Sequence, residues 1–413
     1  MEFRKHTLDN GLEIVAECNG DAHTAALGFF VKTGARDETA KLHGVSHFLE
    51  HMVFKGTPRR TAEDVNREFD EMGAYYNAFT SEENTVFYAA VLSDFVDRAL
   101  RLLSDLMRPS LRSEDFETEK KVIVEEIRMY EDQPPFCADE ICKQLLFDGH
   151  ALGRSVLGTV DSVEALSVEE MRDYFRRRYS PANLTLVGAG RLDFDQFVEQ
   201  AAECCAAWES LAAPRAIEPA KPHAEFRLVH KESATQEYLV QLTPGPSATD
   251  KLRYAAKVLT TVIGDDSGSR MYWKLVDSGL AEHVSQSHHE YLGAGLFMTY
   301  MSCDPGAAED NLNRIEEIYR EVESQSVTPA ELEQARRKIS ARIVLGSERP
   351  RNRLFSVGAN WVQRREYRAV HDDLRAIEAV SLDDLNAVLS QWPLSSNATV
   401  LIGPLSELRQ PRA

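Results

Sequence analysis

The feature of this chain that most constrains its fold is an internal repeat. Residues 163–171 are echoed by residues 377–385, and residues 183–188 by residues 397–403. The offset is the same in both cases, since 377 minus 163 and 397 minus 183 both equal 214. Two separate matches at one offset indicate a duplicated domain.

The stretch between the copies, residues 212–224, is rich in Ala, Pro and Lys and is predicted to be a linker. The repeat then divides the chain into two homologous halves, residues 1–211 and 225–413. Each half is expected to be an α+β unit, with strands and helices arranged around one sheet.

Composition limits the function classes. With 413 residues, of which 43% are hydrophobic, the chain can bury large cores. A formal net charge of -19 argues against a nucleic-acid-binding surface and is compatible with a cleft that attracts basic peptides. No run of 18 apolar residues occurs, and residues 1–6 lack the pattern of a signal peptide. We therefore expect a cytoplasmic protein without a membrane-spanning segment.

The residues with the clearest chemistry are His47, Glu50 and His51, which stand in a His-x-x-Glu-His stretch on a predicted helix. Two histidines four residues apart lie on one helix face, so their ring nitrogens can converge on a single ion. A zinc ion held by neutral imidazoles lowers the pKa of bound water, and a nearby carboxylate can accept the proton. The pattern also occurs by chance, in which case the histidines are ordinary core residues. A third ligand would favour the metal site over this alternative.

A second helix, predicted from Ser113 to about Tyr130, offers that ligand. Its apolar stripe consists of Phe116, Ile123, Ile127 and Tyr130. Glu119 and Glu126 are seven residues apart and share this face, whereas Glu125 points about a third of a turn away. A buried carboxylate needs a partner, and a metal ion would satisfy it. The alternative is that both side chains lie at the edge of the stripe and reach solvent.

The order His-x-x-Glu-His resembles the inverzincins, the pitrilysin or M16 family of zinc peptidases. In that family a Glu about 75 residues after the second His completes the metal site, in a segment similar to Glu-x-x-Val-Ile-x-x-Glu. Here 126 minus 51 is 75, and residues 119–126 fit the segment. Gly44, residues 54–57, Asn77 in an Asn-Ala-x-Thr segment and residues 152–159 are also similar to the family.

The resemblance implies a zinc endopeptidase of the M16B type, similar to mitochondrial processing peptidase subunits and bacterial homologues. Each half is then a mainly antiparallel sheet packed with helices, and the halves enclose a chamber for short or unfolded peptides. One zinc ion per chain is held by His47, His51 and Glu126. Glu50 is the general base, and Glu119 supports the site.

The resemblance also implies where the peptide binds. The substrate pairs as an added strand with an exposed sheet edge, expected here at residues 77–84. The candidate substrate-binding residues are Asn77, Ala78, Phe79 and Arg270. His43, four residues before His47, is predicted to be a neighbour of the site and not a ligand.

The second half departs from the family pattern at two positions. Where M16 enzymes usually carry an Arg and a Tyr that bind the substrate carbonyl, this chain has Leu275 and Glu282. Neither donates a hydrogen bond to an oxyanion at neutral pH. Three explanations stay open: a local substitute among Arg270, Tyr272, His288 and His289; a partner subunit that carries the Arg/Tyr pair, as in two-subunit members of the family; or weak hydrolysis. The resemblance also implies a homodimer or a heterodimer with another M16 subunit.

These departures keep a second function class open, a catalytically silent assembly or peptide-binding subunit in a complex. A zinc hydrolase for small molecules is a third and weaker hypothesis, because no other sequence feature supports it. Among the remaining elements, strands are predicted at residues 12–18, 25–33 and 84–92, and helices at residues 61–72 and 93–107.

Overall fold

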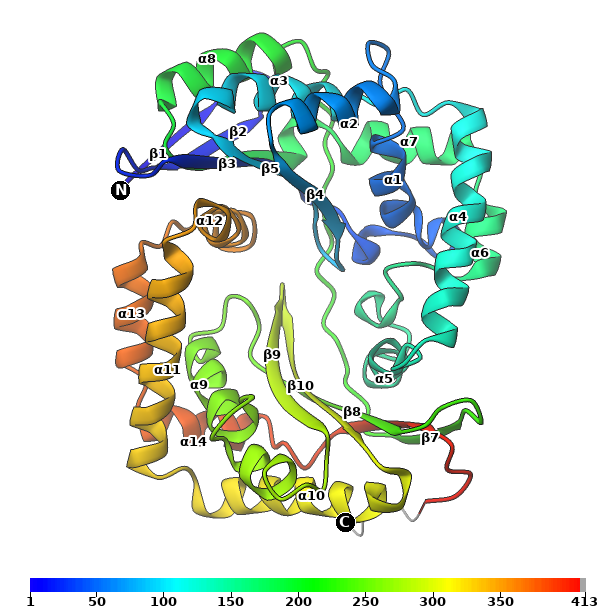
Figure 1. Cartoon of the computed structure of the whole chain (residues 1–413), viewed down its shortest axis with the longest axis vertical. Coiled ribbons are helices and arrows are strands. Elements are labelled where there is room, and N and C mark those ends of the chain that lie inside the picture. The colour runs from blue at the N-terminus through cyan, green and yellow to red at the C-terminus, as the bar shows by residue number, and fades with distance from the viewer. Residues whose placement is uncertain (409–413) are drawn as a thin grey trace. The chain divides into compact units, whose positions relative to one another are not determined.

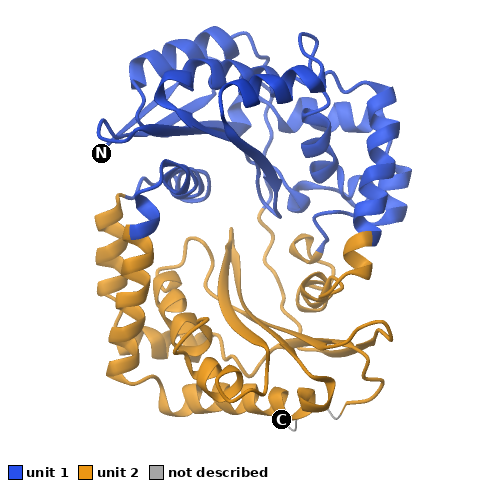
Figure 2. Ribbon diagram, in the orientation of Figure 1, with its two compact units in different colours: residues 1–128, 154–216, 345–368 blue, residues 129–153, 217–344, 369–413 orange. Residues whose placement is uncertain are grey.

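The structure is a computed structural model that describes residues 1–408. The chain forms two compact units, coloured separately in Figure 2. Unit 1 comprises residues 1–128, 154–216 and 345–368; unit 2 comprises residues 129–153, 217–344 and 369–413. One boundary, at residue 216, falls inside the predicted linker. The division into halves 1–211 and 225–413 stays a prediction. Residues 129–153 of the first half belong to unit 2, and residues 345–368 of the second half belong to unit 1.

Unit 1 is built on a six-stranded sheet with the order β1-β2-β6-β3-β5-β4. Figure 1 labels β1 to β5 of this sheet. Its strands are β1 (Glu2–Thr7), β2 (Glu13–Cys18), β3 (Thr24–Val31), β4 (Tyr75–Thr80), β5 (Thr85–Leu92) and β6 (Leu184–Gly190). Only the β2–β6 pair is parallel. β4 is an edge strand, so one side of its backbone is free of sheet partners.

Unit 2 has a five-stranded sheet with the order β7-β11-β8-β10-β9. Its strands are β7 (Phe226–His230), β8 (Glu237–Pro244), β9 (His283–Tyr291), β10 (Ala294–Cys303) and β11 (Ala398–Gly403). The order of these five strands repeats the order β2-β6-β3-β5-β4 of unit 1. The first pair is parallel in both sheets, β2–β6 in unit 1 and β7–β11 in unit 2. This agreement supports the duplication that the sequence repeat predicts.

Helices recur at the same offset. α7 (Val168–Arg178) and α14 (Leu382–Gln391) begin 214 residues apart, since 382 minus 168 is 214. Each begins with a Ser at the N-cap, Ser167 or Ser381, whose side chain accepts a hydrogen bond from the backbone three residues on. The repeated sequence therefore encodes the same helix start twice.

Both faces of the unit 1 sheet are covered by helices. One face packs against α1 (Val45–Val53), α2 (Ala62–Glu71), α3 (Val96–Leu106), α4 (Ser113–Asp132), α6 (Val160–Ala165), α7 and α8 (Phe194–Cys205). The other face packs against α12 (Pro350–Arg364), through Leu354, Val357 and Trp361. Gly358 allows this close approach, because a Cβ there would lie 2.3 Å from the Phe30 ring.

The helices of unit 2 pack around its own core. They are α5 (Ala138–Leu146), α9 (Arg253–Gly264), α10 (Ala308–Gln325), α11 (Pro329–Ser347), α13 (Val370–Glu378) and α14. None of the helices in the described chain is both long and apolar enough to cross a membrane.

Several predicted boundaries need correction. β1 was not predicted, because its six residues carry little of the Val and Ile signal and are mostly exposed. Residues 93–95 form a 3₁₀ turn before α3. The exposed edge lies at Tyr75–Thr80, whereas Asn84 belongs to the turn that follows. Tyr130, predicted on the apolar stripe of α4, is 47% exposed, since it lies beyond the part of the helix that packs on the core.

Candidate metal centre

The site is organised around α1, whose start is held by a buried carboxylate. The Glu38 side chain accepts hydrogen bonds from the backbone N–H groups of Gly44 and Ser46, each at 2.8 Å. These bonds satisfy two of the donors that a helix leaves unpaired at its N-terminus. Gly44 has φ +90°, and a Cβ there would lie 2.7 Å from the Leu157 oxygen. The loop 152–159 therefore packs directly on the start of α1.

The amphipathic sequence of α1 determines which side chains remain for chemistry. Phe48, Leu49 and Met52 are fully buried in the core. The neighbouring positions, occupied by His47, Glu50 and His51, then fall on the other side of the helix. His43 is not part of this face, because the helix begins at Val45 and the His43 ring is hydrogen-bonded to the Ser155 carbonyl at 2.8 Å.

α4 brings two carboxylates to this face. Its Phe116 stacks on Phe48 of α1, with ring centroids 4.7 Å apart. Glu119 is 3% exposed and Glu126 is half-buried, whereas Glu125 carries a largely exposed side chain. The solvent-exposed alternative is thus wrong for Glu119. The seven-residue spacing places Glu126 two turns along the same face.

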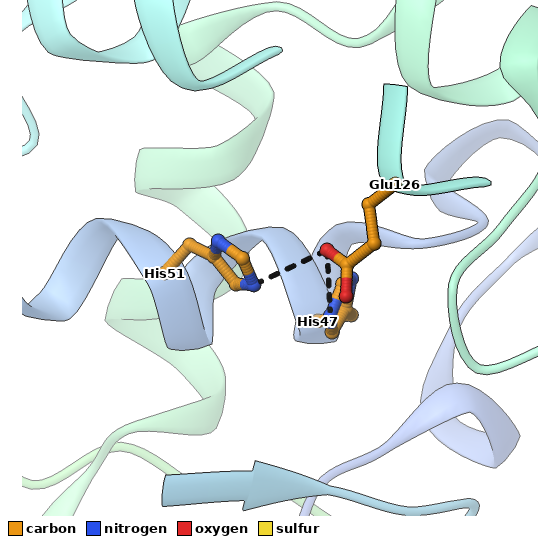
Figure 3. Close-up of side chains that lie close together, drawn as sticks. All are labelled: His47, His51 and Glu126. Carbon is orange, nitrogen blue, oxygen red and sulfur yellow. Dashed lines mark ion pairs between the residues drawn. The ribbon is translucent and has the colours of Figure 1, made fainter. Parts of the chain in front are cut away.

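Figure 3 shows how His47, His51 and Glu126 converge. Glu126 Oε2 lies 3.8 Å from His47 Nε2 and 3.6 Å from His51 Nε2. One donor atom from each residue lies within 4.8 Å of the other two. Glu126 Oε2 is buried and has no hydrogen-bond partner among the described residues. A buried carboxylate oxygen without a partner is costly, so the arrangement favours a bound cation.

The donor set fits zinc. Zinc binds imidazole nitrogen at about 2.0–2.1 Å and carboxylate oxygen at about 2.0–2.2 Å in tetrahedral geometry, which separates neighbouring ligand atoms by roughly 3.4 Å. The observed 3.6 and 3.8 Å differ from this by a few tenths of an ångström. Two imidazoles and one carboxylate leave the fourth position for water, as in catalytic zinc sites.

The two imidazoles are in different electrostatic environments. Burial, together with the charge of His51, lowers the pKa of His47 to about 4. His47 is therefore neutral at pH 7, as a metal ligand must be. Burial also acts to lower the pKa of His51, but the hydrogen bond with Glu119 and the charges of Glu126 and Glu50 outweigh it, so that pKa is raised.

Glu119 orients His51. Its Oε1 lies 2.9 Å from His51 Nδ1, and its Oε2 lies 2.5 Å from the Lys55 ammonium. A carboxylate beside Nδ1 keeps the proton on that nitrogen and leaves the Nε2 lone pair for a metal. The hydrogen bond with His51 and the Lys55 charge outweigh the effect of burial, so the pKa of Glu119 is lowered and the side chain stays ionised.

Glu50 projects toward the edge strand. Its Oε2 accepts a hydrogen bond from Thr80 Oγ1 at 2.7 Å, so β4 fixes the orientation of this carboxylate. Burial raises the pKa of Glu50, and the nearby Glu126 charge acts in the same direction. A carboxylate with a raised pKa is a better proton acceptor near neutrality than an exposed one. Sequence reasoning did not single out Thr80, although it named the Asn-Ala-x-Thr segment that contains it.

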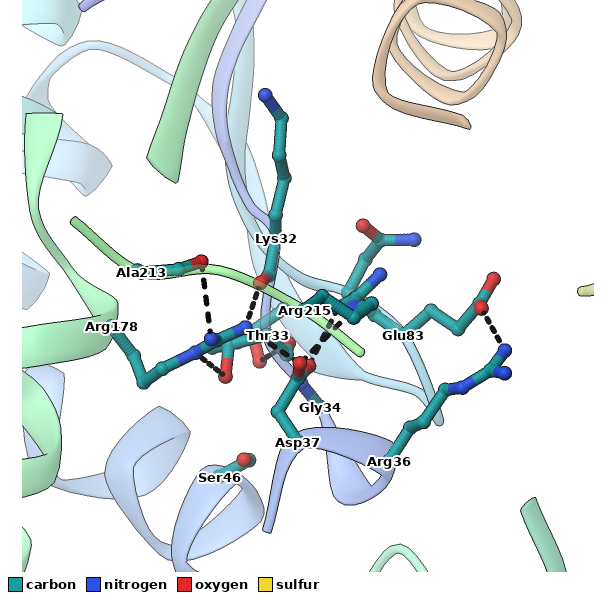
Figure 4. A network of polar contacts seen from close by, with 12 residues as sticks. Lys32, Thr33, Gly34, Arg36, Asp37, Ser46, Glu83, Arg178, Ala213 and Arg215 are labelled. Carbon is teal, nitrogen blue, oxygen red and sulfur yellow. Dashed lines mark hydrogen bonds and ion pairs between the residues drawn. The ribbon is translucent and has the colours of Figure 1, made fainter. Parts of the chain in front are cut away.

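The turn between β4 and β5 is held by the buried ionic network in Figure 4. Arg36 donates to Glu83 at 2.7 Å, and both side chains are almost fully buried. The Asp37 carboxylate lies 2.7 Å from the Arg178 guanidinium and 2.6 Å from that of Arg215. Buried ion pairs of this kind hold their residues in one arrangement, because separating two partners would leave each as an uncompensated buried charge. The network therefore keeps the strand that carries Thr80 in place beside Glu50.

The predicted substrate-binding residues are divided between the two units. Asn77 and Phe79 are exposed on the edge strand, and Ala78 between them is buried. Arg270 lies in unit 2, where it makes a bidentate ion pair with Glu331 at 2.8 and 2.9 Å. Leu275 is fully buried, and Glu282 is exposed and accepts a hydrogen bond from Gln236. The roles of these residues, and of the metal-site residues, stay predictions.

Comparison with known proteins identifies the family. The family profile described as Insulinase (Peptidase family M16) matches residues 13–160, and the profile described as Peptidase M16 inactive domain matches residues 165–339. A protein from Streptomyces coelicolor named as an uncharacterized zinc protease is 33% identical over 99% of this chain and 91% of its own length. The chain belongs to peptidase family M16.

Solved structures agree with this fold. A protease from Helicobacter pylori has a TM-score of 0.92 at 20% identity, covering 98% of this chain and 99% of its own. A chain of complex III from Candida albicans has a TM-score of 0.85 at 15% identity, covering 98% of this chain and 97% of its own. The M16 fold, with two domains of sheets packed against helices, is therefore shared by a protein described as a protease and by a chain of complex III.

Proposed function

We propose that this M16 protein is a zinc-dependent endopeptidase that cleaves short or unfolded peptides. His47, His51 and Glu126 would hold one zinc ion per chain. Zinc at this position supplies the Lewis acidity that makes water nucleophilic at neutral pH and polarises a peptide carbonyl. The observation that carries the proposal is the convergence of these three donors, with Glu126 Oε2 buried and otherwise unpaired.

The chain's own residues supply the proton transfers and the positioning. Glu50 accepts the proton of the attacking water and returns it to the leaving amine, and Thr80 orients its carboxylate. Glu119 holds the His51 tautomer. Glu50 acts while ionised, so activity falls on the acid side as this carboxylate is protonated.

The free edge of β4 is proposed to bind the substrate backbone. An extended peptide that adds to this edge makes main-chain hydrogen bonds and needs no particular side chain for them. Such pairing requires an extended segment, so short or unfolded peptides are the substrates and folded proteins are not.

The test is cleavage of a quenched library of unfolded peptides by the purified protein, with and without a chelator. Glu50→Gln removes the base while preserving size, and Glu125→Gln, on the exposed face of α4, is the matched control. We expect activity that chelator abolishes, that Glu50→Gln lowers by at least about 100-fold and that Glu125→Gln retains. Cleavage that survives both chelation and Glu50→Gln would contradict the mechanism.

A second candidate function is a catalytically weak or silent M16 subunit that acts in a complex with a partner that supplies the Arg/Tyr substrate-binding pair. Leu275 and Glu282, which stand where the family usually has carbonyl-binding Arg and Tyr residues, favour it. Stoichiometric zinc without cleavage, followed by cleavage when an M16 subunit carrying the Arg/Tyr pair is added, would support this function over the first. The cytoplasmic location stays a prediction.

A further inference from the structure

A cavity of about 560 Å³ opens beside the edge strand, on the sheet face that α12 covers. We call it the β4 pocket and define it by Tyr75, Phe79, Tyr88, Arg351, Phe355 and Ala359. Its volume lies within the range of roughly 300–1,000 Å³ that is typical of ligand sites. All of these residues belong to unit 1, so the pocket is a property of one compact unit.

The pocket lies on the opposite face of β4 from the candidate metal centre. Thr80 faces Glu50, and Tyr76 stacks on Phe69 of α2, with centroids 4.0 Å apart. Side chains alternate along a strand, so Tyr75 and Phe79 face α12 instead. Phe79 packs near Phe355 at 5.8 Å between centroids. A peptide added to the edge of β4 therefore presents alternate side chains to the metal face and to the pocket.

The walls of the pocket are aromatic, and two of them are exposed. Tyr75 and Phe79 are 54% and 41% exposed, among the most exposed large apolar side chains of the described chain. Burying a large aromatic side chain stabilises a complex, and stacked or edge-to-face ring pairs add to this. An incoming aromatic side chain that enters the pocket would remove apolar surface of these walls from water.

The charge of the pocket adds a second preference to the one for an aromatic side chain. Arg351 is the single charged residue of its lining, and its guanidinium lies 4.7 Å from the Tyr75 ring centroid. It pairs with no carboxylate of the described residues. No Asp or Glu lines the pocket, so it offers no opposite charge to a lysine or arginine side chain. The unpaired guanidinium favours a carboxylate ligand at this one place, although the net charge of the whole chain, -19, attracts cations.

We propose that the β4 pocket binds a large aromatic side chain of the peptide paired with β4, while Arg351 binds a carboxylate of the same peptide. The carboxylate is either an acidic side chain or the peptide C-terminus. This inference rests on the proposed function for the place of the peptide, and it adds a preference that backbone pairing cannot supply.

The test measures binding as well as cleavage. Fluorescein-labelled unfolded peptides are titrated into the Glu50→Gln protein by anisotropy, and kcat/KM is measured with the parent protein. Matched peptides differ by Phe or Ala at one position and by Glu or Gln at another, each with a free or an amidated C-terminus. We expect Phe to be preferred over Ala by roughly ten- to hundredfold and a carboxylate over its neutral form by about two- to fivefold.

Two variants connect these preferences to the pocket. Ala359→Phe fills the pocket from an exposed helix position and should reduce the Phe preference to below about threefold. Arg351→Gln should remove only the carboxylate preference, and Arg177→Gln, on the exposed face of α7, should change neither. In Arg351→Gln, one pair of peptides, either Glu/Gln or free/amidated, should no longer differ in affinity. That pair identifies which carboxylate Arg351 binds.

The outcomes separate this inference from the proposed function. Selective binding without cleavage would support the pocket and contradict the peptidase. Cleavage with equal rates for Phe and Ala peptides, or a preference that Ala359→Phe leaves unchanged, would overturn the pocket assignment. If Ala359→Phe alters the oligomeric state and leaves peptide selectivity intact, the pocket is a contact between copies of the chain, and the inference is wrong.

Discussion

Replacing Glu119 should weaken zinc binding without removing any predicted ligand. The side chain is 3% exposed and makes two charged contacts, 2.9 Å to His51 Nδ1 and 2.5 Å to the Lys55 ammonium. With Glu119 present, the Nδ1 proton is held in place and the negative charge raises the basicity of Nε2. Glu119→Ala removes both effects, whereas Glu119→Gln keeps an oxygen that can accept the Nδ1 proton and loses the charge.

The magnitude follows from these contacts. The carboxylate behind a metal-ligating histidine is typically worth 10–100-fold in metal affinity, about 1.4–2.7 kcal/mol. Glu119→Gln belongs near the lower value, because the hydrogen bond to His51 survives. Glu119→Ala belongs near the upper value, because the imidazole loses its acceptor and the Lys55 charge is left beside it. The expected order of zinc affinity is parent, then Gln, then Ala.

The assay is competition for zinc with a fluorescent chelator at pH 7.5, with thermal melting of the metal-free proteins to check folding. Glu125→Gln is the control, since this exposed carboxylate lies on the same helix and, within residues 1–408, its ion pair is with Arg128 one turn away. Zinc affinity of Glu119→Ala within twofold of the parent would refute the role assigned to Glu119. An equal loss in Glu125→Gln would show that net charge is responsible and not the hydrogen bond.

Three further predictions concern the scaffold. Gly44→Ala should cost at least about 2 kcal/mol of stability and also weaken zinc binding, because φ is +90° and a Cβ would lie 2.7 Å from a backbone oxygen. Gly73→Ala is the control and should cost less in the same thermal and zinc assays, because the space around Gly73 is open. Burial raises the pKa of Glu237 from 4.5 to about 7, so the folded protein binds this proton more tightly than the unfolded chain. Stability should therefore fall as pH rises from 4.5 to 7, and Glu237→Gln should flatten that part of the curve of melting temperature against pH. Arg353→Met should destabilise by about 3–5 kcal/mol in urea unfolding, because the buried Glu17 carboxylate loses its counterion and keeps only the hydrogen bond from Tyr367 among its described partners. Adding Glu17→Leu should recover part of the loss, and additive costs would contradict the pairing.

Much of the candidate site followed from local sequence patterns. Helical spacing predicted that His47 and His51 share a face of α1 and that Glu119 and Glu126 share a face of α4, and the structure has both. Spacing could not predict that Glu126 approaches both histidines while Glu119 pairs with His51 and Lys55. That difference depends on the packing of Phe116 on Phe48, a contact between segments far apart in the chain.

Elsewhere, local patterns were insufficient. The apolar stripe of α4 predicted a buried Tyr130, but burial depends on where the neighbouring elements end, and Tyr130 lies past them. Residues 129–153 and 345–368 each belong to the compact unit of the other half. No periodicity or turn signal encodes such an exchange, because it is decided by long-range contacts.

The sequence by itself determined the duplicated architecture, the family and the candidate metal ligands, because these depend on repeats and spacings that the covalent chain records directly. Only the tertiary structure decided that Thr80 holds Glu50, that Glu119 lies between His51 and Lys55, and that α12 and β4 enclose an aromatic pocket. These features join residues that are between 30 and about 280 positions apart, for example 80 minus 50 and 355 minus 75. At such separations the packing of whole elements, and not local sequence preference, determines which side chains meet.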